Sequence, residues 1–401
     1  MAATTPTTPA IAPLKGTKLF APLKLGLCEL QHRIVQAPCT RMRGVKESDG
    51  VNVPGDLMVQ YYGQRATRGG LQIVEAADIA RYTSGYPGVC GVFAASQVAG
   101  WKRVADAVHA RGGFAFLQIW HAGRASPPSF RAGAAPPSAG GRPMDGAWPD
   151  GSACAECPPT PMARDEIAAT VRAFAEAAAR AVDAGFDGVE LHGANGYLLD
   201  QFLHDNINDR TDEYGGSVEN RCRFPLEVVK AVCDAIGPEK AGVRLSPWNY
   251  FQSTMDSDRL GTWSYLCEQL VALPASQRPV YVHMIEPRFD EVLDEQQKID
   301  SLAGGDKKVA VSLSPFREIL QKGGILFVSA GCFDRDNSVS KLESGATDLV
   351  AYGRWFIANP DLPKKLADGI PFTKYDRSTF YFTEPPEKGY ADYPIYAAEV
   401  A

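Results

Sequence analysis

The feature that most constrains the fold is an alternation of short apolar runs with longer amphipathic segments, repeated eight times along the chain. The apolar runs have the length and flanking turn residues of buried strands, and the segments between them have the spacing of amphipathic helices. The expected strands are residues 33–40, 71–79, 114–122, 188–192, 241–246, 280–285, 325–330 and 348–352. The expected helices lie near residues 55–67, 96–110, 165–184, 217–236, 262–273, 315–322, 335–344 and 354–368. This order predicts an α/β fold, a (β/α)8 TIM barrel with its active site at the carboxyl ends of the strands.

Two long connections interrupt the alternation. Residues 123–160 follow the third strand and are rich in Pro, Gly and Ala, and residues 286–308 follow the sixth and are rich in Asp, Glu, Gln and Lys. Both follow a strand, so both belong to the catalytic face, where long loops usually cap a pocket. We expect a single domain at 18–396, a flexible N-terminal tail at 1–17 and a short C-terminal tail at 397–401.

Composition limits the classes of partner. A net charge of −6 argues against nucleic acid, and no apolar run approaches the roughly 20 residues that span a bilayer. The first 13 residues lack the basic region and apolar core of a secretory signal, which favours a cytoplasmic protein and leaves a short organellar leader as the alternative. The nine cysteines show no framework spacing, and the Cys154-x-x-Cys157 pair has no second pair or nearby histidine, so we expect no metal. Small molecules are the expected partners.

Polar side chains crowd the end of the fourth strand, which reads GVELH and ends at His192. Asn195 lies three residues further, so a helical turn after the strand would point both side chains the same way. Two neutral hydrogen-bond donors could then hold a carbonyl or phenolate oxygen and stabilise negative charge there. Tyr197 would reach another part of the pocket and deliver a proton to carbon. A structural role for a histidine at a strand end is the alternative.

The same stretch closely resembles the signature of the old yellow enzyme family. The resemblance rests on HGANGYLLDQF from His192 to Phe202 and NDRTDEYGGSVENR from Asn208 to Arg221. That family comprises FMN-dependent ene-reductases, including the plant 12-oxophytodienoate reductases. It implies that His192 and Asn195 bind the activating oxygen of the substrate and that Tyr197 is the catalytic acid, a role open to a side chain that is ordinarily protonated at neutral pH.

The resemblance also implies a tightly bound, non-covalent FMN held at the strand ends. Thr40 would bond a ring carbonyl, Gln118 the pyrimidine edge, and Arg244 the same edge when the reduced ring carries charge. An internal ion pair of Arg244 with Glu75 or Glu190 is the alternative, since a buried arginine needs a partner. The full set of expected FMN residues is Pro38, Cys39, Thr40, Ala76, Gln118, Arg244, Gly331, Cys332, Gly353, Arg354 and Phe380.

Within that set, the residues after the seventh and eighth strands would bind the phosphate. These are Gly331, Cys332, Gly353 and Arg354, placed where many barrels build such a site. Trp120 and Tyr381 would border the substrate together with the oxygen-binding pair.

We therefore expect an ene-reductase that transfers hydride from NADPH through FMN to the β-carbon of α,β-unsaturated carbonyl compounds. No G-x-G-x-x-G follows a strand, which argues that the nicotinamide uses the substrate pocket. Phenols are expected ligands, and the protein is expected to be a monomer or a homodimer. The alternatives are a flavin-dependent isomerase of the same fold and a flavoprotein that binds phenols or steroids without physiological turnover.

Overall fold

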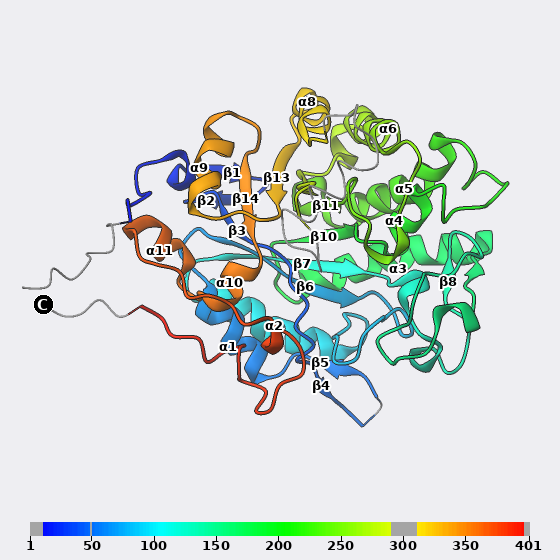
Figure 1. Cartoon of the computed structure of the whole chain (residues 1–401), viewed down its shortest axis with the longest axis horizontal. Coiled ribbons are helices and arrows are strands. Elements are labelled where there is room, and N and C mark those ends of the chain that lie inside the picture. The colour runs from blue at the N-terminus through cyan, green and yellow to red at the C-terminus, as the bar shows by residue number, and fades with distance from the viewer. Residues whose placement is uncertain (1–10, 49, 290–310, 397–401) are drawn as a thin grey trace, which may run out of the picture.

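Eight parallel strands close into a barrel in the computed structural model, which describes residues 11–48, 50–289 and 311–396 (Figure 1). The barrel strands are β3 (Ile34–Gln36), β6 (Leu71–Asp78), β7 (Phe114–Trp120), β10 (Gly188–Gly193), β11 (Ala241–Leu245), β12 (Tyr281–Ile285), β13 (Leu326–Ala330) and β14 (Leu349–Tyr352). Each strand pairs with the next in the chain, and β14 returns to pair with β3. The predicted (β/α)8 barrel is confirmed.

Helices follow the barrel strands at nearly all the expected positions. They are α1 (Asp56–Arg65), α2 (Ala95–His109), α3 (Arg164–Asp183), α4 (Leu198–Leu203), α5 (Val218–Ile236), α6 (Arg259–Ala272), α8 (Ser314–Lys322), α9 (Arg335–Glu343), α10 (Arg354–Ala358) and α11 (Leu362–Asp368). The single last helix expected at 354–368 was wrong, because Pro360 follows α10 and cannot supply a helical N–H. Asn359 fills the break and donates to the carbonyls of Trp355 and Thr373.

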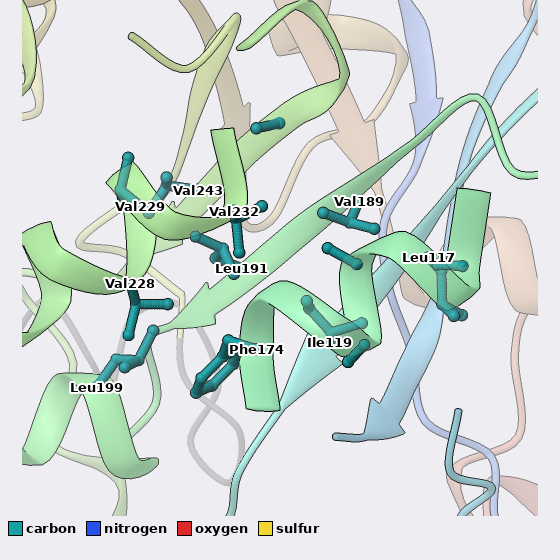
Figure 2. Close-up of a cluster of buried hydrophobic side chains, with 14 of the residues drawn as sticks. Leu117, Ile119, Phe174, Val189, Leu191, Leu199, Val228, Val229, Val232 and Val243 are labelled. Atoms are coloured by element: carbon teal, nitrogen blue, oxygen red, sulfur yellow. The ribbon is translucent and has the colours of Figure 1, made fainter. Parts of the chain in front are cut away.

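The faces of the strands are set by strict alternation. Val189 and Leu191 of β10 point outward and pack against Phe174 of α3 and the valines of α5 (Figure 2). Because successive side chains of a strand lie on opposite faces, Glu190 and His192 point into the barrel. The same alternation sends every second residue of β7, β11 and β12 into the interior.

The barrel interior changes from apolar to polar along the strands. Its amino-terminal half is filled by an apolar layer that continues into the hairpin of β1 (Leu23–Leu25) and β2 (Cys28–Leu30). This layer includes Val35, Ile73, Phe116, Tyr281, Val328 and Leu349. The carboxyl half instead holds Gln118, Glu190, His192, Arg244 and His283, all less than a tenth exposed. Polar chemistry is therefore concentrated at the carboxyl ends of the strands.

The first long connection lies on that end of the barrel. It contains β8 (Pro137–Ser138), which pairs with β9 (Thr160–Pro161). Arg124 anchors it by donating to the carbonyls of Arg142 and Gln252. Of the second expected connection, at 286–308, only residues 286–289 lie within the described residues. A third small sheet pairs β4 (Val45–Lys46) with β5 (Asn52–Val53).

Residues 369–396 run back past α1 after the last helix, in red in Figure 1. Buried arginines from the start of the chain hold this segment by its carbonyls. Arg41 donates to the carbonyls of Phe380 and Gly389, and Arg65 donates to that of Tyr390. The connection after β3 and the end of α1 are thus joined directly to this C-terminal segment.

Two further observations concern the ends of the chain and membranes. The backbone N–H groups of Leu14 and Lys15 donate to the last turn of α11, at the carbonyls of Leu366 and Ala367. The proposed domain boundaries at 18 and 396 stay a prediction. Among the helices that the structure describes, none combines the length and apolar character needed to cross a membrane.

Candidate active site

Four rings gather at the carboxyl mouth of the barrel. Trp120 from β7 meets Tyr197 edge-on at 4.6 Å between ring centroids, and His192 from β10 meets Tyr197 at 4.8 Å. Tyr86 stacks against Trp120 at 6.1 Å, and the hydroxyls of Tyr86 and Tyr197 lie 3.3 Å apart. Trp120, His192 and Tyr197 are 2%, 5% and 8% exposed. The structure thus brings three of the predicted site residues together and adds Tyr86, which sequence reasoning missed because its loop carries no periodic pattern.

The His192 ring is held in its neutral form. Burial lowers its pKa well below the ordinary 6.5, and the nearby charges of Arg244 and His283 lower it further. Its Nδ1 atom is buried and has no hydrogen-bond partner among the described residues. A neutral imidazole keeps one N–H donor and one acceptor, so His192 can donate to a ligand without carrying charge.

The backbone around Asn195 does not make the helical turn that the spacing from His192 suggested. Asn195 and Gly196 both adopt positive φ, at 59° and 74°, and helix α4 begins only at Leu198. The N–H of Asn195 donates to Ser246 Oγ at 2.8 Å, which attaches this turn to the end of β11. The expected helical geometry was wrong, although His192 near the end of β10 and Asn195 in the connection that follows it still lie close in the chain.

Two side chains of α4 hold the turn that carries Tyr197. Asp200 accepts the N–H of Gly196 at 2.8 Å, and Gln201 donates to the carbonyl of Gly196 at 2.7 Å. Gln201 also donates to the carbonyl of Ala122 at 3.1 Å, so it links this turn to the connection after β7. Both residues are fully buried. Tyr197 is therefore fixed by its neighbours in sequence, a role that the motif did not reveal.

A hydrogen-bond network centred on Glu190 occupies the barrel interior. Its carboxylate accepts from Gln118 Nε2 and His283 Nδ1, both at 2.8 Å, and from the Tyr281 hydroxyl at 3.1 Å. Burial alone would raise the pKa of Glu190, but His283, Arg244 and these hydrogen bonds hold it below its ordinary value. A carboxylate only accepts, so the NH2 of Gln118 faces Glu190 and its carbonyl oxygen is turned away from that contact.

Arg244 does not form the internal ion pair considered as its alternative role. Within the described residues it pairs with neither Glu75 nor Glu190, and Glu75 instead accepts from the Tyr62 hydroxyl and the N–H of Arg41. Arg244 Nη1 donates to the carbonyl of Pro38 at 3.5 Å, and its Nε is buried without a partner in the part of the chain that the structure describes. A buried cation in this state requires an electron-rich ligand.

The expected FMN residues of the first strand lie beyond its end. Strand β3 stops at Gln36, so the expected strand 33–40 was too long, and Cys39 and Thr40 are half-buried in the connection that follows. Burial raises the pKa of the Cys39 thiol, and the charges of Arg244, Arg41 and Arg354 oppose this rise. Positive charge from three separate parts of the chain therefore acts on Cys39.

The expected phosphate residues meet the start of the second long connection. Gly331 has φ of 109°, and a side chain there would place its Cβ 2.8 Å from Phe289 Cβ. Arg288 Nε donates to the carbonyl of Gly331 at 3.2 Å, and the guanidinium of Arg354 lies 5.0 Å from the centroid of the Phe289 ring. Gly353, at the start of α10, lies against the sulfur of Cys39. Arg288 and Phe289 were missed, because no motif marks them.

The remaining predicted residues differ in their surroundings. Ala76 is buried at a bulge of β6 and belongs to the same apolar cluster as Trp120 and Tyr197. Phe380 is 9% exposed with the Arg41 guanidinium 5.7 Å from its ring, whereas Tyr381 is 50% exposed. Cys332 adopts φ of 51° and its carbonyl accepts from Asn337. Their roles toward a ligand stay predictions.

The interior fits a planar heterocycle with several carbonyl and ring-nitrogen groups. His192 Nδ1, Arg244 Nε and His283 Nε2 are buried and have no partner within residues 11–48, 50–289 and 311–396, and they come from three adjacent strands whose side chains face inward. Gln118 adds an amide of fixed orientation, and the arginines near Cys39 add positive charge. These groups complement the pyrimidine edge and phosphate of a flavin nucleotide.

Comparison with known proteins gives concordant matches. A model of the NADH:flavin oxidoreductase / NADH oxidase family matches residues 18–373. The flavin oxidoreductase hxnT of Emericella nidulans is 55% identical over 96% of this chain and 99% of its own length. The 12-oxophytodienoate reductase 1 of Oryza sativa subsp. japonica is 45% identical over 96% and 95%. A structure of morphinone reductase in complex with tetrahydroNAD superposes with a TM-score of 0.81 at 37% identity, covering 96% of this chain and 99% of that one.

Proposed function

The chain belongs to the NADH:flavin oxidoreductase / NADH oxidase family, and from that premise we propose that it is an FMN-dependent reductase that uses NADPH to saturate C=C bonds conjugated to a carbonyl. The observation that carries this proposal is the meeting of Trp120, His192 and Tyr197 at the barrel mouth, together with an Arg244 Nε that has no partner among the described residues. Relatives named for oxophytodienoate and morphinone reduction support the substrate class.

The cofactor would lie across the carboxyl ends of the strands. When bound, FMN supplies hydride exchange between the nicotinamide and the β-carbon of the substrate. Arg244 and Gln118 would hold its pyrimidine edge, with Arg244 stabilising negative charge in the reduced state. Arg354 and the backbone at Gly331 would hold its phosphate. The apolar layer beneath the polar interior would close this site on its amino-terminal side.

The substrate oxygen would be bound by His192 and Asn195. A neutral histidine is suited to this task, because it donates a hydrogen bond without the cost of burying a second cation beside Arg244. Both donors become stronger partners as charge develops on the oxygen, so they lower the barrier more than they stabilise the ground state. Phenolates would bind the same donors as dead-end ligands.

Tyr197 would deliver the proton to the α-carbon. Its ring is fixed by Trp120 and His192, and its backbone by the contacts that Asp200 and Gln201 make with Gly196. A positioned acid of this kind typically accelerates a reaction 10²- to 10⁴-fold. The contact between the hydroxyls of Tyr197 and Tyr86 places a second phenol within reach to replace the proton.

Spectroscopy of the purified protein tests the proposal in three steps. A flavin spectrum, bleaching under anaerobic NADPH, and recovery of the oxidised spectrum on adding cyclohexenone are expected in that order. Bleaching without recovery would favour a phenol- or steroid-binding flavoprotein, and conversion of an enone without net NADPH consumption would favour an isomerase. A protein purified without flavin that does not take up FMN would overturn the proposal.

A further inference from the structure

Asn249 lies on the connection between β11 and α6 and is only 4% exposed. Its side-chain oxygen accepts two backbone N–H groups, from Tyr250 at 2.7 Å and from Phe251 at 3.0 Å. An amide NH2 cannot accept from a backbone N–H, so these two donors determine which end of the Asn249 amide is the oxygen. The NH2 end must then point away from them.

That NH2 end meets the side chain of Asn195. Asn249 Nδ2 donates to Asn195 Oδ1 at 2.9 Å, so the oxygen of Asn195 is engaged and its own NH2 is the opposite end. Among the described residues, nothing accepts a hydrogen bond from Asn195 Nδ2. The backbone of Asn195 is also held, through its positive φ and its N–H bond to Ser246 Oγ. The amide therefore has one orientation.

We propose that Asn249 is a positioning residue that makes Asn195 a pure hydrogen-bond donor toward the substrate oxygen. The inference rests on the proposed function, in which Asn195 binds that oxygen. Without Asn249, the Asn195 amide could turn over and present its oxygen to the ligand, which would repel a phenolate or a developing enolate. The backbone N–H groups of Tyr250 and Phe251 thus orient the Asn249 amide, and Asn249 in turn makes Asn195 present its NH2 group to the ligand.

The substitution Asn249→Asp tests this orientation with almost no change of shape. An aspartate still accepts from the N–H groups of Tyr250 and Phe251, so the connection keeps its cap. It can no longer donate to Asn195 Oδ1 and accepts from Asn195 Nδ2 instead, which turns the amide over. Titration with 4-hydroxybenzaldehyde, followed by the long-wavelength charge-transfer band, should show a Kd raised about 10- to 100-fold, with FMN content unchanged.

Making the same substitution in a protein that already carries Asn195→Ala separates the effect of amide orientation from the effect of the added negative charge. In Asn195→Ala, the change Asn249→Asp can act only by repulsion through space, so its effect on the Kd should fall to a few-fold at most. Asn249→Ala removes the donor without adding charge, and should raise the Kd by roughly 2- to 10-fold because the Asn195 amide is then free to turn. This variant carries the test if Asn249→Asp does not retain FMN.

The outcomes are distinct. An unchanged Kd in both Asn249 variants, or an equal rise in the presence and absence of the Asn195 amide, would overturn the positioning role. A wild-type protein that binds FMN but shows no band and no phenol binding would instead remove the oxygen clamp of the proposed function, whatever Asn249 does. A larger Kd for Asn249→Asp than for Asn249→Ala, lost in Asn195→Ala, supports the inference.

Discussion

Replacing Tyr197 with phenylalanine removes one hydroxyl and leaves the ring packing in place. The edge-on contacts with Trp120 at 4.6 Å and His192 at 4.8 Å do not involve the oxygen, and the hydroxyl itself contacts that of Tyr86 at 3.3 Å. Loss of one neutral hydrogen bond destabilises a protein by about 0.5 to 1.5 kcal/mol. The fold and the FMN site should therefore be retained.

The expected kinetic effect is larger than that structural effect. Losing a positioned acid slows a reaction about 10²- to 10⁴-fold, which corresponds to roughly 2.7 to 5.5 kcal/mol of barrier. The slowing should appear only where carbon must be protonated, in the oxidation of reduced flavin by cyclohexenone. Reduction of the flavin by NADPH transfers hydride and needs no proton from Tyr197, so its rate should stay near wild type. Quinone and nitro acceptors should also react almost normally.

Stopped-flow measurement of the two half-reactions checks this expectation, with Tyr86→Phe as the matched control. The control removes the same hydroxyl contact from its other side and leaves the acid in place, so its enone half-reaction should slow less than about 10-fold. Equal slowing of flavin reduction and enone turnover in Tyr197→Phe would refute the reasoning. It would mean that Tyr197 shapes the pocket and does not supply the proton.

Three further predictions follow from the site and its supports. Replacing His192 and Asn195 together with leucine should weaken phenol binding by about 3 to 6 kcal/mol, and an unchanged affinity and charge-transfer band would rule the clamp out. Burial lowers the pKa of His32 to about 4 in the folded protein, so below pH 6.5 the unfolded state binds more protons than the folded state. His32 should therefore reduce the free energy of unfolding by about 2 kcal/mol when the pH falls from 7 to 5. Urea unfolding should show that loss in wild type and a shallower pH dependence in His32→Gln, and equal dependence would contradict the assignment. Arg65→Met should destabilise the fold by about 3 kcal/mol and lower the Tm, because four buried carbonyls lose their donor. Arg65→Lys should destabilise the fold by less. A wild-type Tm in the methionine variant would show that these contacts contribute little.

The barrel could be predicted because its strands are buried on both faces and read as continuous apolar runs between turn residues. Errors appeared where a local rule competes with that pattern. Strand β3 ends at Gln36, because the chain leaves the sheet before Pro38, whose ring nitrogen has no N–H to donate. The last helical segment has good amphipathic spacing, yet Pro360 divides it.

The sequence predicts those site residues that lie at the ends of strands and whose residue types suit ligand binding or catalysis. His192, Trp120 and Arg244 follow from strand alternation, since each inward side chain is two residues from the next. Asn249 and Tyr86 could not be found this way, because their partners depend on how two connections fold against each other. The spacing of His192 and Asn195 suggested a helical turn, and the positive φ of Asn195 shows that tertiary contacts overrode it.

The arginine contacts of the C-terminal segment also limit when this part of the structure can form during synthesis of the chain. Arg41 leaves the ribosome long before its acceptor, since 348 residues separate it from Gly389. At synthesis rates of about 5 to 20 residues per second, that interval is roughly 20 to 70 seconds. Throughout it the Arg41 guanidinium lacks this carbonyl acceptor. The contacts of Arg41 with the C-terminal segment can therefore form only after residues 380–389 have been synthesised.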